Sequence, residues 1–163
     1  MARLSNAKGV QYNVATKSGS VKEADWQRLA KYITTVTDSG EDVSEEYTDY
    51  LTGSPVQAIK AYKEVYEFEG FYDETDPAMK LIKGLKRETG DKKIIFFQVK
   101  DSETTASGEA TVYNIVAGDG EASEYRKFKC TIAFNGVPEV ESNEEWKEPS
   151  LLVLKRVRKT MKK

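Results

Sequence analysis

Hydrophobic and polar residues alternate along several short segments of the chain, which is the pattern of half-buried β-strands. Residues 11–16 are bounded by turn residues, and residues 32–37 are rich in β-branched side chains, so both segments predict strands. The longer segment 56–71 predicts a strand with one largely aromatic and one mostly charged face. Residues 94–99 and 110–117 are apolar on both faces, so we expect them in the centre of a sheet.

The clearest alternation lies in residues 125–135. The side chains expected to face the core are Phe128, Cys130, Ile132 and Phe134. Cys130 would then be a small buried residue. The preceding Gly118-Asp119-Gly120 predicts a hairpin turn rather than a dinucleotide-binding loop, because the third glycine of that motif is missing and a strand follows.

One helix start is clear. Thr75 or Asp76 can cap the first N–H groups, and Pro77 suits the first helical position. Apolar side chains then recur at helical spacing, at Ala78, Leu81, Ile82 and Leu85. With Gly90 as terminator, the predicted helix spans residues 76–90. The fold class predicted is mainly β, an antiparallel sandwich or barrel-like sheet with one flanking helix.

Charge is distributed unevenly along the chain. Residues 38–55 read as a long polar loop, and no basic residue lies between Lys31 and Lys60. The acids of this stretch are Asp38, Glu41, Asp42, Glu45, Glu46 and Asp49. The end of the chain is basic, with Lys155, Arg156, Arg158, Lys159, Lys162 and Lys163. The two stretches are either solvated surfaces or contacts between neighbouring subunits, and both interpretations stay open.

Composition limits the possible chemistry. The chain has 163 residues, 39% of them hydrophobic, a net charge of −2, one cysteine and no histidine. This length fits a single domain, and with no apolar run near ~20 residues and no signal segment we expect a soluble, non-exported protein. One cysteine excludes an internal disulfide, and the lack of histidine removes the usual general base and metal ligand. We expect no enzyme activity, no cofactor and no metal, although catalysis by carboxylates or lysine stays open.

Two alternative functions rest on the segment 56–71. Glu67 and Glu69 lie on one face of the predicted strand, as paired catalytic carboxylates or as ordinary exposed residues. An aromatic face of Tyr62, Tyr66 and Phe68 is compatible with a monomeric β-sandwich that binds a carbohydrate or peptide.

Two stretches resemble a known family. The first is residues 25–40, followed by the acidic stretch and Asp49-Tyr50-Leu51-Thr52-Gly53. The second is residues 66–73, where an aromatic–acid–glycine–aromatic corner leads into Asp76-Pro77-Ala78. Together with residues 3–8 and 130–134, this order resembles the major tail (tail tube) proteins of long-tailed bacteriophages, most closely those of phages of Gram-positive bacteria. The resemblance covers most of residues 1–140.

This resemblance implies a β-sandwich-like fold whose copies form hexameric rings, stacked into a hollow tube that conducts DNA. The related tubes of phage-tail-like bacteriocins and of contractile tails are alternatives within the same class. The chain would be one tail-tube domain over residues 1–163. Its parts would be an N-terminal arm (1–10), an acidic assembly loop (38–55), a helix (76–90) and a C-terminal extension (141–163).

The resemblance also implies partners and a location. The partners are other copies of the chain and the tape-measure, tail-tip and tail-terminator proteins, while DNA passes without sequence-specific binding and no membrane is involved. The location is the virion tail, assembled from protein made in the host cytoplasm.

Three sets of residues are candidates for this role. Glu64, Glu67 and Glu69 are lumen candidates, because carboxylates would let DNA slide where fixed bases would grip its phosphates. The acids of residues 38–49 are candidates for contact between rings, ordered on assembly. The candidate partners of these acids are the basic side chains Lys155, Arg156, Arg158 and Lys159.

Overall fold

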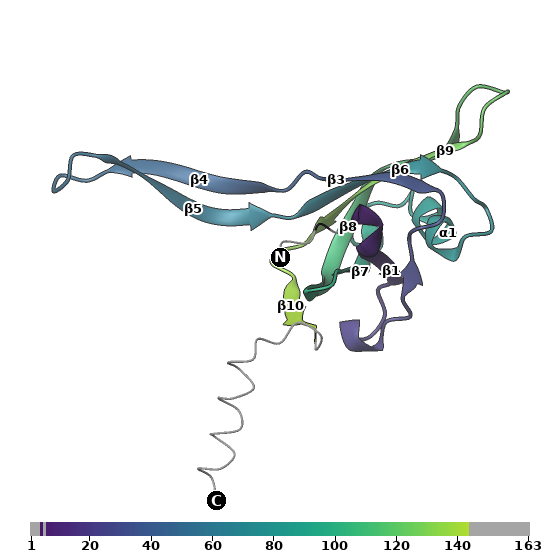
Figure 1. Ribbon diagram of the computed structural model, residues 1–163, viewed down its shortest axis with the longest axis horizontal. Coiled ribbons are helices and arrows are strands. Elements are labelled where there is room, and N and C mark those ends of the chain that lie inside the picture. Colours follow the sequence, from purple (N-terminus) through teal and green to yellow (C-terminus); the bar gives the residue numbers. More distant parts are fainter. Residues whose placement is uncertain (1–3, 5, 144–163) are drawn as a thin grey trace, which may run out of the picture.

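The structure is a computed structural model that describes residue 4 and residues 6–143. In chain order the strands are β1 (Gln11–Thr16), β2 (Gln27–Arg28), β3 (Ile33–Asp38), β4 (Glu41–Thr48), β5 (Pro55–Lys63), β6 (Val65–Phe71), β7 (Ile94–Lys100), β8 (Thr104–Asp119), β9 (Lys127–Phe134) and β10 (Glu139–Ser142). The helix α1 is Pro77–Gly84, and short 3₁₀ turns occupy Ala7–Gly9, Val21–Glu23 and Gly90–Lys93 (Figure 1).

The main sheet is antiparallel throughout, with the strand order β2-β1-β7-β8-β9-β6-β3 and with β10 beside β8. Strand β8 joins its two halves, because residues 105–111 pair with β7 and residues 110–119 pair with β9. The sheet forms a half-barrel with α1 packed against it (Figure 1). The predicted fold class, mainly β with one flanking helix, is therefore confirmed.

The core lies between the sheet and α1. Met79 and Ile82 of the helix are fully buried against the aromatic side chains of the sheet. Phe97 has no exposed surface, and its ring lies 5.1–6.4 Å from the rings of four other aromatic residues. The predicted inward face of β9 is confirmed, with Cys130 only 2% exposed. This burial accounts for most of the hydrophobic stabilisation available to the chain.

The predicted start of the helix is confirmed, and its predicted end is wrong. The Oδ1 atom of Asp76 accepts a hydrogen bond from the Ala78 N–H at 3.1 Å, and Pro77 occupies the first turn. The helix ends at Gly84 rather than at Gly90. The N–H groups of Leu85 and Lys86 bond to carbonyls three residues back, which tightens the last turn and ends the α-helical pattern. This turn lets Leu85 pack on the core.

Residues 38–55 are not a loop. Strand β4 pairs with β5 in a two-stranded antiparallel sheet that projects from the body of the molecule (Figure 1). We call residues 41–63 the hairpin arm. The strand expected at residues 56–71 is two strands, β5 in the arm and β6 in the main sheet, separated at Glu64. Because β4 is exposed on both faces, its sequence need not alternate, and its strand structure depends on pairing with β5.

The remaining expectations fall partly outside the described residues. The strand expected at residues 32–37 is present as β3. Residues 144–163, with most of the C-terminal extension, lie outside the described part of the chain. No helix among the described residues is long and apolar enough to cross a membrane.

Candidate assembly surfaces

The hairpin arm exposes nearly all its side chains. All eight residues of β4 are exposed, as is every residue of β5 except the half-buried Ala58. The large apolar side chains left in solvent are Val43, Tyr47, Tyr50, Leu51, Val56, Ile59 and Tyr62. An isolated two-stranded hairpin is marginally stable in water, and its unpaired edges invite another chain. The arm therefore has the features of a surface that another molecule covers.

The strand register distributes the arm's acids over two faces. Successive side chains of a strand point to opposite faces, so Asp42 and Glu46 share one face while Glu41 and Glu45 share the other. The Glu45 carboxylate lies 2.6 Å from the Lys60 ammonium group, and is partly neutralised within the arm. The face of Asp42 and Glu46 carries no ion pair among the described residues.

The other two acids stand at the two ends of the arm. A carboxylate oxygen of Asp38 accepts a hydrogen bond from the Gly40 N–H at 3.0 Å, where the arm leaves the body. At the tip, Asp49 accepts hydrogen bonds from the N–H and the hydroxyl of Thr52, both at 2.7 Å, and these bonds lower the pKa of its carboxyl. The structure thus places five of the six predicted acids in the hairpin arm and Asp38 at the end of β3, next to the base of the arm.

The three lumen candidates do not share a face of the sheet. Glu67 and Glu69 on β6 point away from the core, and Glu69 lies 3.1 Å from the ammonium group of Lys129 on β9. Glu64 points the other way, and its Oε1 atom accepts a hydrogen bond from the Tyr66 hydroxyl at 2.5 Å. Burial and this hydrogen bond raise the pKa of Tyr66. The outward face that β6 and β9 form together is therefore not purely acidic.

The aromatic face that would support a ligand-binding module is not assembled. Tyr66 and Phe68 are 8% and 2% exposed and belong to the core, whereas Tyr62 lies in the arm. An exposed aromatic platform made of these three residues is therefore absent from the described structure.

The half of the main sheet that leads to the arm has two open edges. Within the described residues, β3 pairs only with β6, and residues 112–119 of β8 pair only with β9. Three successive antiparallel pairings separate β3 from β8, so these two edge strands run in opposite directions. The β8 edge of one copy can thus pair antiparallel with the β3 edge of another.

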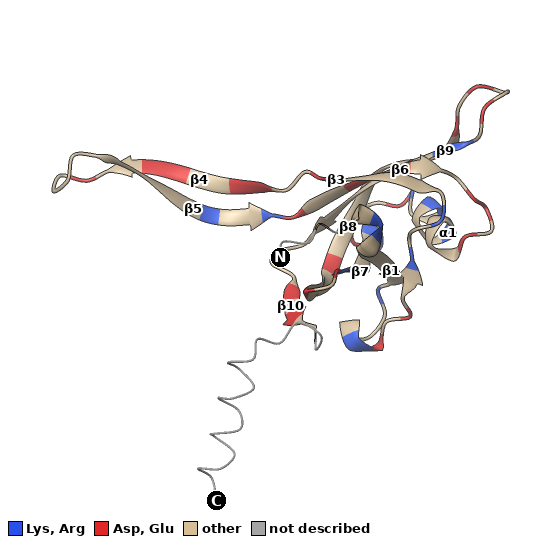
Figure 2. Cartoon of the chain, in the orientation of Figure 1, with Lys and Arg blue, Asp and Glu red and all other residues tan. Residues whose placement is uncertain are grey.

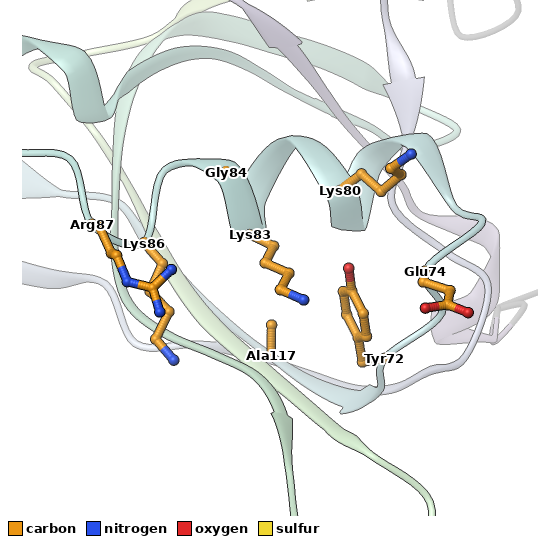
Figure 3. A pocket seen from close by; sticks show the side chains of 8 residues that line it. All are labelled: Tyr72, Glu74, Lys80, Lys83, Gly84, Lys86, Arg87 and Ala117. Atoms are coloured by element: carbon orange, nitrogen blue, oxygen red, sulfur yellow. The ribbon is translucent and has the colours of Figure 1, made fainter.

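A basic groove, not anticipated from the sequence, lies beside α1. It has a volume of about 920 Å³, and its charged lining residues are Glu74, Lys80, Lys83, Lys86 and Arg87 (Figure 3). At one end lies Tyr72, whose ring centroid is 4.8 Å from both the Lys83 ammonium group and the Arg126 guanidinium group. In the sequence, the three-residue spacing of Lys80, Lys83 and Lys86 indicated a basic helix face. It could not show that Tyr72 and Arg126 lie beside this face.

Other predicted groups contribute no site that the structure describes. Lys155, Arg156, Arg158 and Lys159 lie outside the described residues, so their contacts remain a prediction. Burial raises the pKa of the Cys130 thiol, which favours its unreactive protonated form. The described residues contain no group of three acidic or sulfur ligands that could hold a metal ion.

The fold, but not the sequence, is similar to known proteins. No protein-family model matches the chain, and no curated protein matches it. A chain in the tail of an empty gene transfer agent particle, solved with C6 symmetry, has a TM-score of 0.66 at 12% identity over 85% of this chain and 99% of that chain.

Two further structures come from other particles. A chain in the tube-terminating cap of the anti-feeding prophage has a TM-score of 0.56 at 11% identity, over 88% of this chain and 94% of that one. A chain in the sheath-tube complex of an extracellular contractile injection system has a TM-score of 0.52 at 10% identity, over 85% of this chain and 91% of that one. At these identities the likeness shows a shared fold.

Proposed function

We propose that the chain is the structural subunit of a phage-like tail tube, not an enzyme. Copies close into rings, and rings stack into a hollow tube. The observation that carries the proposal is the exposed hairpin arm, which projects from a fold shared with chains of tail and sheath-tube particles. An exposed arm with apolar side chains in solvent is stabilised when a second copy covers it.

Ring closure uses the two open edges of the sheet. Each copy contributes the four strands β3, β6, β9 and the second half of β8, an even number, so antiparallel alternation continues from one copy to the next. A head-to-tail interface of this kind closes when the rotation between copies divides a full turn. Closure then removes the exposed β3 and β8 edges of every copy. The C6 symmetry of the gene transfer agent tail supports six copies per ring.

The outward face of β6 and β9 lines the lumen in this arrangement, and the tube conducts DNA. Glu67 and Glu69 then face the passage, with Lys129 compensating Glu69. A balanced lining of this kind holds few fixed cations against the phosphates, so DNA slides rather than binds. Glu64, on the opposite face of the strand, would not reach the lumen in this orientation.

Ring stacking uses the hairpin arm in place of the expected loop. Its acids meet basic side chains of the next ring, and the C-terminal Lys155, Arg156, Arg158 and Lys159 are one proposed set. Replacing these four residues with Glu should impair tube growth without altering single rings. Tubes of unchanged length would refute this pairing.

We further propose the particle and its other proteins. The sequence resemblance favours a phage of Gram-positive bacteria, with the tube of a phage-tail-like bacteriocin as the alternative. The tube would then lie in the virion tail and contact tape-measure, tail-tip and tail-terminator proteins. Likeness to a chain of a tube-terminating cap supports a capping partner with a related fold.

The proposal is tested by negative-stain electron microscopy of the purified protein over a range of concentrations, with light-scattering mass measured on the same samples. Rings or hollow tubes, with a mass that grows with concentration, are expected. Purified tail-tip complexes serve as seeds where rings do not form unaided. A monomer at every concentration that also fails to extend seeds refutes the proposed function.

A further inference from the structure

The charged surfaces of the molecule are separated along its longest axis. The arm projects from one end with its acids along β4, whereas α1 and its lysines lie toward the opposite end (Figure 2). Glu74 is the one carboxylate that lines the basic groove, against four cationic side chains. None of the four cations forms an ion pair with another described residue.

Head-to-tail stacking brings these two ends together. The arm continues the direction of β3 and β6 (Figure 1), so in a tube whose rings all face the same way and whose strands run along the tube axis, the arm end of one ring meets the opposite end of the next ring. We propose that the basic groove beside α1 receives the Asp42–Glu46 face of the hairpin arm from a copy in the neighbouring ring. This inference rests on the proposed tube function and identifies the surface that receives the arm.

The spacing of the charges on the two surfaces is compatible. Asp42 and Glu46 lie four residues apart on one strand face, which corresponds to about 13 Å. Lys80 and Lys83 lie about one helical turn apart, and Lys86 and Arg87 extend the row of cations beyond the end of the helix. Two carboxylates can therefore face separate cations at the same time.

Neutral side chains of both surfaces also match. The arm face that carries Asp42 and Glu46 also carries Ile59 and Tyr62, both exposed. In the groove, Tyr72 is a lining residue whose ring is held in place by contacts with Lys83 and Arg126. Apolar contact would exclude water around the ion pairs, which weakens their screening by salt.

A charge-swap experiment tests the pairing. The groove variant is Lys80→Glu with Lys83→Glu, the arm variant is Asp42→Lys with Glu46→Lys, and the third protein carries all four changes. The matched control is Lys8→Glu with Lys22→Glu, which reverses two exposed lysines on other turns. Circular dichroism confirms folding, and tube length is measured by electron microscopy at fixed concentration.

We expect the groove and arm variants each to form rings but to shorten tubes about tenfold or more, because like charges then face each other. The four-change protein should recover tubes of near wild-type length, and the control should not differ from wild type. Long tubes from the groove variant, or no recovery in the four-change protein, would overturn the inference. Such results leave the tube function standing if the wild-type chain still forms tubes, so the two failures are distinguishable.

Discussion

Deleting residues 41–63 removes the hairpin arm and tests whether it serves assembly rather than folding. The cut leaves Gly40 and Glu64 as a two-residue turn between β3 and β6. The flanking register is already that of a tight hairpin, because Asp38 is paired with Tyr66 and the Ser39 N–H donates to the Val65 carbonyl at 2.9 Å. Glycine at the first central position suits a type II′ turn.

The expected cost to the body is small. The arm's strands pair with each other and with no strand of the main sheet, and their side chains are exposed. The side-chain hydrogen bonds at the junction that the new turn can disturb run from the Tyr66 hydroxyl to Glu64 and from the Gly40 N–H to Asp38, each worth about 1 kcal/mol. For a chain of this size, 1 kcal/mol corresponds to about 2–4 °C, so we expect a change in Tm below about 8 °C.

Thermal melts followed by circular dichroism measure stability, and electron microscopy with light scattering measures assembly. The deletion variant should unfold cooperatively near the wild-type Tm and should form no tubes. The variant Tyr66→Phe, which lacks the same hydrogen bond but keeps the arm, is the matched control and should still form tubes. A loss of cooperative unfolding, or normal tubes from the deletion variant, would contradict the reasoning.

Three further predictions concern the body of the protein. Phe97→Ala should destabilise the fold by about 3–5 kcal/mol in urea denaturation, because the ring is fully buried among aromatic neighbours. Burial raises the pKa of Asp76 above its ordinary 3.8. The folded state is therefore favoured while the carboxyl is protonated, fully below pH 3.8, and this contribution to the free energy of unfolding is lost as the pH rises through the raised pKa. The stability of Asp76→Asn relative to wild type should therefore improve between about pH 4 and about pH 7, and a flat difference in melting temperature would contradict this assignment. Cys130 should react with a thiol reagent only on unfolding, because it is buried and its pKa is raised; rapid labelling of the native protein would show otherwise.

Local spacing in the sequence was sufficient to predict an element where its own residues carry the physical signal. The alternation around Cys130 predicted which side chains of β9 enter the core, and Pro77 after Asp76 predicted where the helix begins. In both places a short stretch of chain must satisfy its own burial or its own free N–H groups. The physical cause and the sequence signal therefore lie in the same few residues.

Tertiary structure decided the features on which assembly depends. The arm is exposed on both faces, so no alternation marks β4 as a strand, and its pairing with β5 is a long-range choice of register. The break between β5 and β6 at Glu64, which separates the arm from the main sheet, likewise depends on which strands pair.

The basic groove likewise depends on contacts between distant segments, because Arg126 reaches the Tyr72 ring beside Lys83 only after the sheet has folded. Sequence alone therefore determined a β-rich body, its inward-facing residues and one capped helix. The surfaces available to other copies were decided in three dimensions, since they depend on which strands pair and which edges stay open.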